Sequence, residues 1–257
     1  MRIDNFLVEI GKYPSRTKAS EFIKAGKVLY KGKPVKPSFM VDSLEDITFV
    51  EGLTFVSNGG YKLEKALTEF NYNVSDKTFI DIGASNGGFT DCLFKRGAKK
   101  VYCVDVGESQ LDKSLLDKNV VILDNFNARN LSIKDISCEV DGITCDVSFI
   151  SLTYIICVLN PLLKKGGVGF LLIKPQFECG KTHLNKNGII TSNDVKIKVC
   201  EKIYNECLKY GLIPINLTNA PIKENKNVEF ILQIIKDEKI IPFDKNLIKE
   251  TIRGAKC

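Results

Sequence analysis

Four charged residues have the types and the chain positions needed for acid–base chemistry: Lys62, Asp146, Lys174 and Glu229. A lysine can take a proton from a weak nucleophile such as a hydroxyl group only if its pKa is lowered. Desolvation and a second cation both have that effect. We expect Lys174 to be the base and Lys62 to be the nearby cation. The two carboxylates would orient the ammonium groups and balance their charge.

The order of the hydrophobic segments indicates how these residues could meet. From about residue 78 onward, buried strands alternate with helices, which is typical of a parallel, doubly wound sheet. Predicted strands end at Asp146 and at Lys174, and the last one opens with Glu229. Ligands of such sheets bind outside the carboxyl ends of the strands. Three of the four residues are therefore expected to face one crevice, while Lys62 begins a helix in the preceding linker.

The predicted fold class is α/β, with a mostly parallel seven-stranded sheet. Its last two strands follow each other directly, which predicts a terminal antiparallel hairpin and favours the Rossmann-like methyltransferase fold over a dehydrogenase fold. The predicted strands are 78–83, 100–106, 120–124, 141–146, 168–174, 212–219 and 228–235. The predicted helices are 60–70, 87–96, 111–117, 152–160 and 193–210.

A glycine-rich turn follows the first strand of this sheet. Glycines let a backbone approach a ligand closely, and a helix N-terminus favours a negative group. That group would be the pyrophosphate of NAD or the methionine carboxylate of S-adenosylmethionine. The absence of strict G-x-G-x-x-G spacing and the acidic residue near the strand's end favour S-adenosylmethionine. The cofactor contacts expected from this segment are Asp81, Gly83, Ala84, Ser85, Gly87, Gly88 and Phe89.

Further cofactor contacts are expected at the ends of the later strands. Asp105 lies about twenty residues after the glycine-rich turn, where an acidic residue can accept hydrogen bonds from ribose hydroxyls. Asp124 or Asn127 could contact the adenine, and Asp146 would lie beside the cofactor as well as in the catalytic set.

Competing chemistries fit these positions less well. The turn Asp146-Val-Ser-Phe149 lacks the paired prolines typical of enzymes that methylate exocyclic amines. Cys145 could be a nucleophile, but strand alternation turns it away from Asp146 and favours a buried structural role. His183 lies in a polar loop and is expected at the surface. With one histidine and nine scattered cysteines without C-x-x-C spacing, no metal site is expected.

The positive charge of the chain is concentrated at its N-terminus. Residues 1–37 contain nine basic and three acidic side chains, so this segment accounts for the whole net charge of +6. Such a segment is typical of a polyanion-binding module, although it would also suit a solvated basic surface.

The N-terminal segment also has a recognisable pattern of elements. Two short helices, with Ser15 capping the second, precede strands at 27–30, 33–36 and 46–50. With the segments 2–4, 15–19 and 23–28 it resembles the RNA-binding domain first described in ribosomal small-subunit protein S-four, a small α+β domain. The resemblance implies contacts to RNA phosphates from Arg2, Arg16, Lys18, Lys24 and Lys27.

Taken together, the motifs of the whole chain resemble those of the TlyA family, whose catalytic domain is FtsJ-like. The motifs lie at 56–63, 81–90, 146–152, 174–178 and 227–229. The resemblance implies 2'-O-methylation of ribosomal RNA, at cytidines in known members. It also places the family's Lys-Asp-Lys-Glu set on the four residues named first.

From these observations we expect three segments: an RNA-binding domain at 1–55, a methyltransferase domain at 56–240 and a C-terminal tail at 241–257. The expected partners are ribosomal RNA and ribosomal subunits, with no membrane and no metal. The protein would be cytoplasmic, because no signal-peptide pattern is found, and a monomer or weak dimer. Two alternatives stay open: a membrane-active hemolysin, a label often given to this family, and an inactive RNA-binding adaptor.

Overall fold

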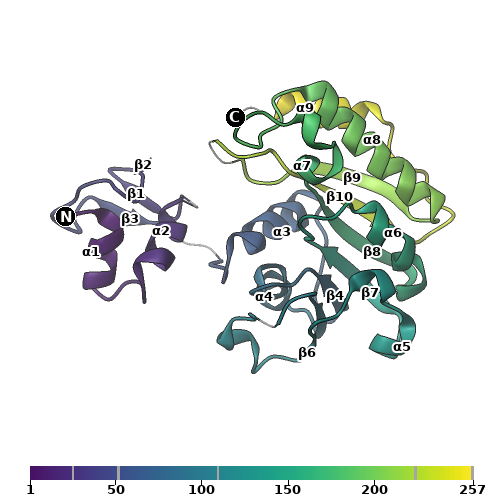
Figure 1. Cartoon of the computed structure of the whole chain (residues 1–257). Coiled ribbons are helices and arrows are strands. Elements are labelled where there is room, and N and C mark those ends of the chain that lie inside the picture. Colours follow the sequence, from purple (N-terminus) through teal and green to yellow (C-terminus); the bar gives the residue numbers. More distant parts are fainter. Residues whose placement is uncertain (25, 51–52, 109, 223–224, 256–257) are drawn as a thin grey trace. The chain divides into compact units, whose positions relative to one another are not determined.

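The computed structural model describes residues 1–24, 26–50, 53–108, 110–222 and 225–255. The chain forms two compact units, Met1–Asn58 and Gly59–Cys257, each with its own hydrophobic core (Figure 1).

The first unit joins two helices to a small antiparallel sheet with strand order β2-β1-β3. The predicted cap is present, since the Lys18 backbone N–H donates to Ser15 Oγ at 3.3 Å. Its elements are α1 (Ile3–Glu9), α2 (Arg16–Lys24), β1 (Val28–Tyr30), β2 (Lys33–Pro34) and β3 (Ile47–Phe49). Its core consists of Ile3, Leu7, Ala19, Ile23, Val28, Val41 and Ile47. The predicted small α+β domain is confirmed.

The second unit is built on a seven-stranded sheet with order β6-β5-β4-β7-β8-β10-β9. Its strands are β4 (Thr78–Ile82), β5 (Lys100–Val104), β6 (Val120–Leu123), β7 (Val140–Cys145), β8 (Leu163–Ile173), β9 (Ile213–Asn219) and β10 (Phe230–Ile235). The pairs between neighbours from β6 to β8 are parallel, and β10 is antiparallel to both β8 and β9. The predicted methyltransferase-type sheet with its terminal hairpin is confirmed.

Helices cover both faces of this sheet (Figure 1). They are α3 (Asn58–Glu69), α4 (Gly88–Lys95), α5 (Ile133–Ile136), α6 (Thr153–Leu159), α7 (Pro175–Glu178), α8 (Asn193–Lys209) and α9 (Asn246–Gly254). The core on one face takes in α6, α8 and α9 together with Ile80 and Ile82 of β4. Side chains alternate along a strand, so Asp81 points to the opposite face, where Thr90 of α4 meets it. Asn58 and Gly59 divide the units within the first turn of α3.

One predicted helix, 111–117, is wrong. The chain forms only a short 3-10 turn at Lys113–Leu115, with the Asp112 carboxylate accepting from the Ser114 backbone N–H. Leu111 and Leu115 are both buried, so two residues with helical i, i+4 spacing here anchor an irregular segment.

The C-terminal tail is ordered and contributes to the second core. Ile248 and Ile252 of α9 are buried in the cluster that contains α8, and the Tyr204 hydroxyl donates to the Phe243 carbonyl oxygen at 2.8 Å. The last two residues of the predicted tail lie outside the described residues. None of the described helices is long and apolar enough to cross a membrane.

Candidate functional site

Two lysine–carboxylate pairs form from the four residues singled out in the sequence. Lys174 Nζ lies 2.5 Å from Asp146 Oδ1 and donates to Ser148 Oγ at 2.7 Å. Lys62 Nζ lies 2.6 Å from Glu229 Oε2. Lys174 is 8% exposed, which is unusual for a lysine and is tolerated because the ammonium has these two partners.

The sheet register explains why the pairs occur at one edge. Ile173 of β8 is opposite Phe230 of β10, so Lys174 and Glu229 each lie one residue beyond the same end of this antiparallel ladder. Gln176, in the turn after β8, donates to Glu229 Oε1 at 3.3 Å. The structure therefore brings together residues that are far apart in the chain, as the strand ends predict.

A cavity of about 390 Å³ opens beside the Lys174–Asp146 pair, at the carboxyl ends of β4, β5 and β7. Five of the predicted cofactor residues line it: Gly83, Ser85, Asp105, Asn127 and Asp146. The other six do not: Asp81, Ala84, Gly87, Gly88, Phe89 and Asp124. The sequence did not single out the apolar lining, which includes Val106, Phe126, Ile150 and Ile155.

Gly83 holds the glycine-rich turn against the backbone of Asp146. Its φ is +79°, and a Cβ at this position would lie 2.7 Å from the Asp146 carbonyl oxygen. A side chain would both clash and be strained here. The glycine therefore lets the glycine-rich turn and Asp146 share a wall of the cavity.

Asp105 fixes two turns at the edge of the cavity. Its Oδ2 accepts from the Ser85 backbone N–H at 2.8 Å, and its Oδ1 accepts from the Gly107 N–H at 2.9 Å. Each carboxylate oxygen has a further lone pair, so a hydroxyl of a ligand can still be bound. Asn127 instead accepts through its side-chain Oδ1 from the backbone N–H and the Nε of Arg129. Its side-chain NH2 group can donate to a ligand.

Asp81 supports the site from beneath and has no surface in the cavity. It is fully buried and accepts hydrogen bonds from Thr90 Oγ1 at 2.7 Å and Thr144 Oγ1 at 2.8 Å. Burial raises its pKa to about 6, and the two hydroxyl groups partly offset that effect. The alternation of β4, which the sequence shows, could have indicated that Asp81 lies on the face opposite Ile80 and Ile82.

The raised pKa of Asp81 predicts a specific pH dependence of stability. The folded state holds the Asp81 proton more tightly than the unfolded chain. The contribution of Asp81 to the free energy of unfolding is therefore most favourable below about pH 4. It becomes less favourable as the pH rises to about 6 and does not change at higher pH. A shift from 3.8 to about 6 corresponds to about 3 kcal/mol. As the pH rises from 4 to 8, the free energy of unfolding of Asp81→Asn should increase by up to that amount relative to that of the wild type, as measured by urea unfolding. Parallel pH profiles for the two proteins would contradict the assignment.

Phe149 is a feature that the sequence reading missed. Its side chain is 91% exposed at the rim of the cavity, and its φ of +63° is strained for a non-glycine residue. Its ring centroid lies 5.0 Å from that of Phe177, which follows Lys174 by three residues. An exposed aromatic ring in a strained conformation at the rim of a cavity makes Phe149 a candidate for ligand contact.

The side chains considered for competing chemistry lie where the sequence predicts. Cys145 is fully buried in the core, where desolvation raises the pKa of its thiol to about 12, so it is not a poised nucleophile. His183 is exposed. Within the described residues, no group of histidine, cysteine and acidic side chains could hold a metal ion.

The predicted RNA contacts of the first unit separate into two groups. Arg2, Arg16 and Lys24 line one open depression of about 530 Å³. Lys18 Nζ instead donates to the Val56 carbonyl oxygen at 2.5 Å, and Lys27 does not line the depression.

Comparison with known families separates the same two parts of the chain. The model of the FtsJ-like methyltransferase family matches residues 55–235, and the model of the S4 domain matches residues 1–47. The first match covers the seven-stranded sheet and all four charged residues of the two pairs.

Curated relatives and solved structures match almost the whole chain. Hemolysin A of Brachyspira hyodysenteriae is 38% identical over 239 residues, covering 91% of this chain and 100% of that protein. The 16S/23S rRNA (cytidine-2'-O)-methyltransferase TlyA of Mycobacterium tuberculosis is 36% identical over 236 residues, covering 90% and 88%. A solved structure from Streptococcus thermophilus, which carries a hemolysin name, is 35% identical with a TM-score of 0.76, covering 99% and 95%.

Proposed function

Because the chain belongs to the FtsJ-like methyltransferase family and its relatives include TlyA, we propose that it methylates ribose 2'-hydroxyls of ribosomal RNA with S-adenosylmethionine. The observation that carries the proposal is the buried Lys174–Asp146 pair beside a cavity at the carboxyl ends of the strands. The cytidine named for the Mycobacterium tuberculosis relative is the first nucleotide to test.

The cavity has the chemical features that S-adenosylmethionine requires. Phe126 and Ile155 offer apolar surface for an adenine ring, and Asp105 retains acceptor capacity for ribose hydroxyls. Asp146 provides a negative charge for the cationic end of the cofactor. When bound, the cofactor supplies an electrophilic methyl group.

In its neutral amine form, after its ammonium has released a proton, Lys174 is placed to take the proton of the attacking hydroxyl. Asp146 and Ser148 fix the position of its Nζ, so the nitrogen needs little rearrangement to meet a substrate. The Lys62–Glu229 pair adds a second ammonium at the same sheet edge, and Gln176 holds Glu229 in place. In this scheme Lys174 moves the proton, while Lys62 binds and orients the acceptor nucleotide.

The test is transfer of labelled methyl groups from S-adenosylmethionine to unmodified ribosomal subunits. The modified ribose should resist alkaline cleavage at its 3' phosphodiester, because the 2'-oxygen can no longer attack it. Label on a base, or no transfer to either subunit, would contradict the proposal. Lysis of red cells by the purified protein without cofactor would instead favour the function in the name of the Brachyspira relative.

Phe149 is proposed to stack on the base of the target nucleotide. Stacking on an aromatic side chain contributes about 1–3 kcal/mol per base, so Phe149→Gly should lower kcat/KM for RNA by about fivefold to a hundredfold. The folded protein should lose little stability. Glycine relieves about 1 kcal/mol of strain at positive φ, which offsets about 0.5–1.5 kcal/mol from the lost ring contact with Phe177.

The matched control is Phe149→Tyr, which keeps the ring and should keep most of the activity. Methylation assays at several RNA concentrations, with thermal unfolding of each variant, separate the two effects. Wild-type kcat/KM in Phe149→Gly would exclude the stacking role.

A further inference from the structure

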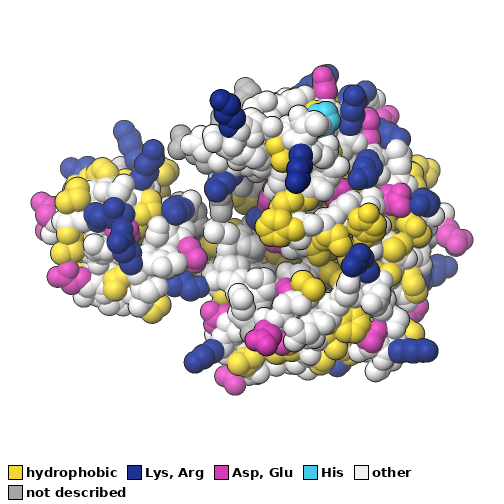
Figure 2. Space-filling view, in the orientation of Figure 1, with side chains coloured by type: hydrophobic (Ala, Val, Ile, Leu, Met, Phe, Trp, Pro, Cys, Tyr) yellow, Lys and Arg dark blue, Asp and Glu magenta, His cyan; other side chains and the backbone are white. Residues whose placement is uncertain are grey.

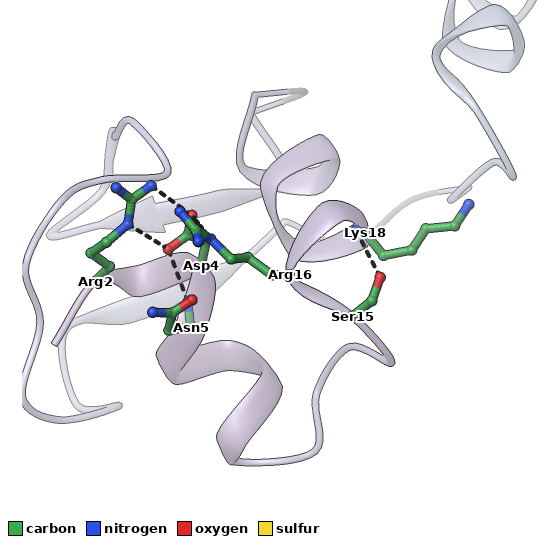
Figure 3. A network of polar contacts seen from close by, with 6 residues as sticks. All are labelled: Arg2, Asp4, Asn5, Ser15, Arg16 and Lys18. Atoms are coloured by element: carbon green, nitrogen blue, oxygen red, sulfur yellow. Dashed lines mark hydrogen bonds and ion pairs between the residues drawn. The ribbon is translucent and has the colours of Figure 1, made fainter.

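The first unit contains a buried carboxylate held between two arginines (Figure 3). Asp4 is 1% exposed. Arg2 donates to it through Nε at 3.0 Å and through Nη2 at 2.8 Å, and Arg16 donates through Nε at 3.1 Å. The Arg2 hydrogen bonds hold the pKa of Asp4 down at about 2. Asp4 is thus a charged acceptor for two guanidinium groups, and its Oδ1 also accepts from the Asn5 backbone N–H at 3.0 Å.

The backbone fixes Asp4 independently of the arginines. Asp4 lies in the first turn of α1, between the core residues Ile3 and Leu7. Its N–H donates to the Pro37 carbonyl oxygen at 3.3 Å, and the Ile3 N–H donates to the Phe39 carbonyl oxygen at 2.7 Å. A charge anchored in this way can determine the orientation of more mobile side chains.

The arginines keep donors that the carboxylate does not use. Arg16 bonds Asp4 only through Nε, and Arg2 only through Nε and Nη2. Both Nη groups of Arg16 and Nη1 of Arg2 therefore have no hydrogen-bond partner within the described residues. The Arg2 and Arg16 side chains are 39% and 58% exposed, so these donors are accessible to a ligand.

The two arginines line the depression of about 530 Å³ together with other groups suited to an anion. Lys24 adds a third cation, and Thr17 and Ser20 add hydroxyl donors. Glu21 also lines the depression, but Lys18 Nζ lies 3.8 Å from its carboxylate and offsets its charge. Figure 2 shows dark-blue basic side chains gathered on the first unit.

We propose that Asp4 is a positioning residue that holds Arg2 and Arg16 as a clamp for one backbone phosphate of RNA. The guanidinium fork matches the geometry of phosphate oxygens, and a fixed fork loses less entropy on binding than a free one. Lys24, Thr17 and Ser20 complete the phosphate site. The inference rests on the proposed function and adds to it an acidic residue that strengthens the binding of a polyanion.

The test exploits the sign of a charge change. Asp4→Asn removes a negative charge from a polyanion-binding surface, so simple electrostatics predicts tighter RNA binding. Loss of positioning predicts the opposite, a Kd for a fluorescent stem-loop RNA raised by about threefold to thirtyfold at constant salt. Binding as tight as or tighter than that of wild type would overturn the proposal.

Two further variants of the full chain keep the result interpretable. Asp46→Asn makes the same charge change in the same unit. Asp46 pairs with Lys31 at 3.3 Å and does not line the depression. The Kd of Asp46→Asn for the stem-loop RNA should therefore equal that of the wild type or be slightly lower. Arg16→Lys keeps the charge, removes the fork and changes an exposed side chain, so it should fold even if Asp4→Asn does not. Wild-type affinity in Arg16→Lys would also overturn the clamp.

The readouts distinguish this inference from the proposed function. A disturbed clamp should raise KM for ribosomal RNA while leaving kcat at saturating RNA and the calorimetric Kd for S-adenosylmethionine unchanged. A fall in kcat would show that Asp4 acts on more than RNA capture and would contradict the assignment. If the wild-type protein transfers no methyl group, the proposed function fails, yet the comparison of RNA affinities still tests the clamp.

Discussion

Replacement of Lys174 by alanine is expected to lower kcat for methyl transfer by at least about a hundredfold, the usual contribution of a positioned general base. Binding of S-adenosylmethionine should persist, because Lys174 is not among the residues that line the cavity. Single-turnover methylation and calorimetric titration of the cofactor measure the two quantities separately. A near-normal rate in Lys174→Ala would exclude Lys174 as the base.

Replacement by arginine shows whether the lost activity comes from the loss of a proton acceptor or from the loss of a positive charge. Lys174→Arg keeps a cation but cannot act as a base near neutral pH, so it should be almost as inactive as alanine. Substantial activity in Lys174→Arg would assign the residue an electrostatic role instead. The matched control is Lys164→Ala, which breaks a lysine–aspartate pair with Asp141 between the same two strands, β7 and β8, at 2.6 Å. It should retain kcat, because this pair lies at the far end of these strands.

Gly83→Ala is expected to be the most damaging single change to cofactor binding. The new Cβ would meet the Asp146 carbonyl oxygen at 2.7 Å, and the φ of +79° is unfavourable for alanine. Either the turn or the strand end must move, so both the cavity and the Lys174–Asp146 pair are displaced. We expect the Kd for S-adenosylmethionine to rise at least about tenfold and the free energy of unfolding to fall by about 1–3 kcal/mol.

Gly166→Ala is the matched control for backbone strain. Gly166 has a similar φ of +76°, but a Cβ there would meet nothing within 4 Å. This variant should lose only about 1 kcal/mol of stability and should bind cofactor normally. If both variants bind cofactor equally well, the close approach of Gly83 to Asp146 has no part in the site.

The sequence alone was sufficient for the type of sheet and for the sheet edge at which the proposed catalytic residues lie. Alternating strands and helices require parallel strands, and parallel strands bring their carboxyl ends to one edge. Asp146 and Lys174 could therefore be placed beside a cavity without coordinates. The positive charge of residues 1–37 was compatible with a polyanion-binding unit, and the resemblance of this segment to the S4-type domain indicated RNA as the polyanion.

Where local sequence patterns were ambiguous, the tertiary structure determined the conformation of the segment and the surroundings of its side chains. Leu111 and Leu115 have helical spacing, yet they anchor an irregular segment, because packing against the rest of the unit overrides local propensity. Asp81 ends a strand beside the glycine-rich turn, but the face it occupies depends on which helix covers that side of the sheet.

The partner of each charged residue was also decided by the fold. Periodicity describes one segment at a time, whereas an ion pair depends on the register between segments that are distant in the chain. The sequence predicts that Lys62, Asp146, Lys174 and Glu229 lie close together. Only the fold pairs Lys174 with Asp146 and Lys62 with Glu229. The ion pairs of Asp4 also depend on the fold, since Arg2 is close to it in the chain but Arg16 reaches it only when α2 packs against α1.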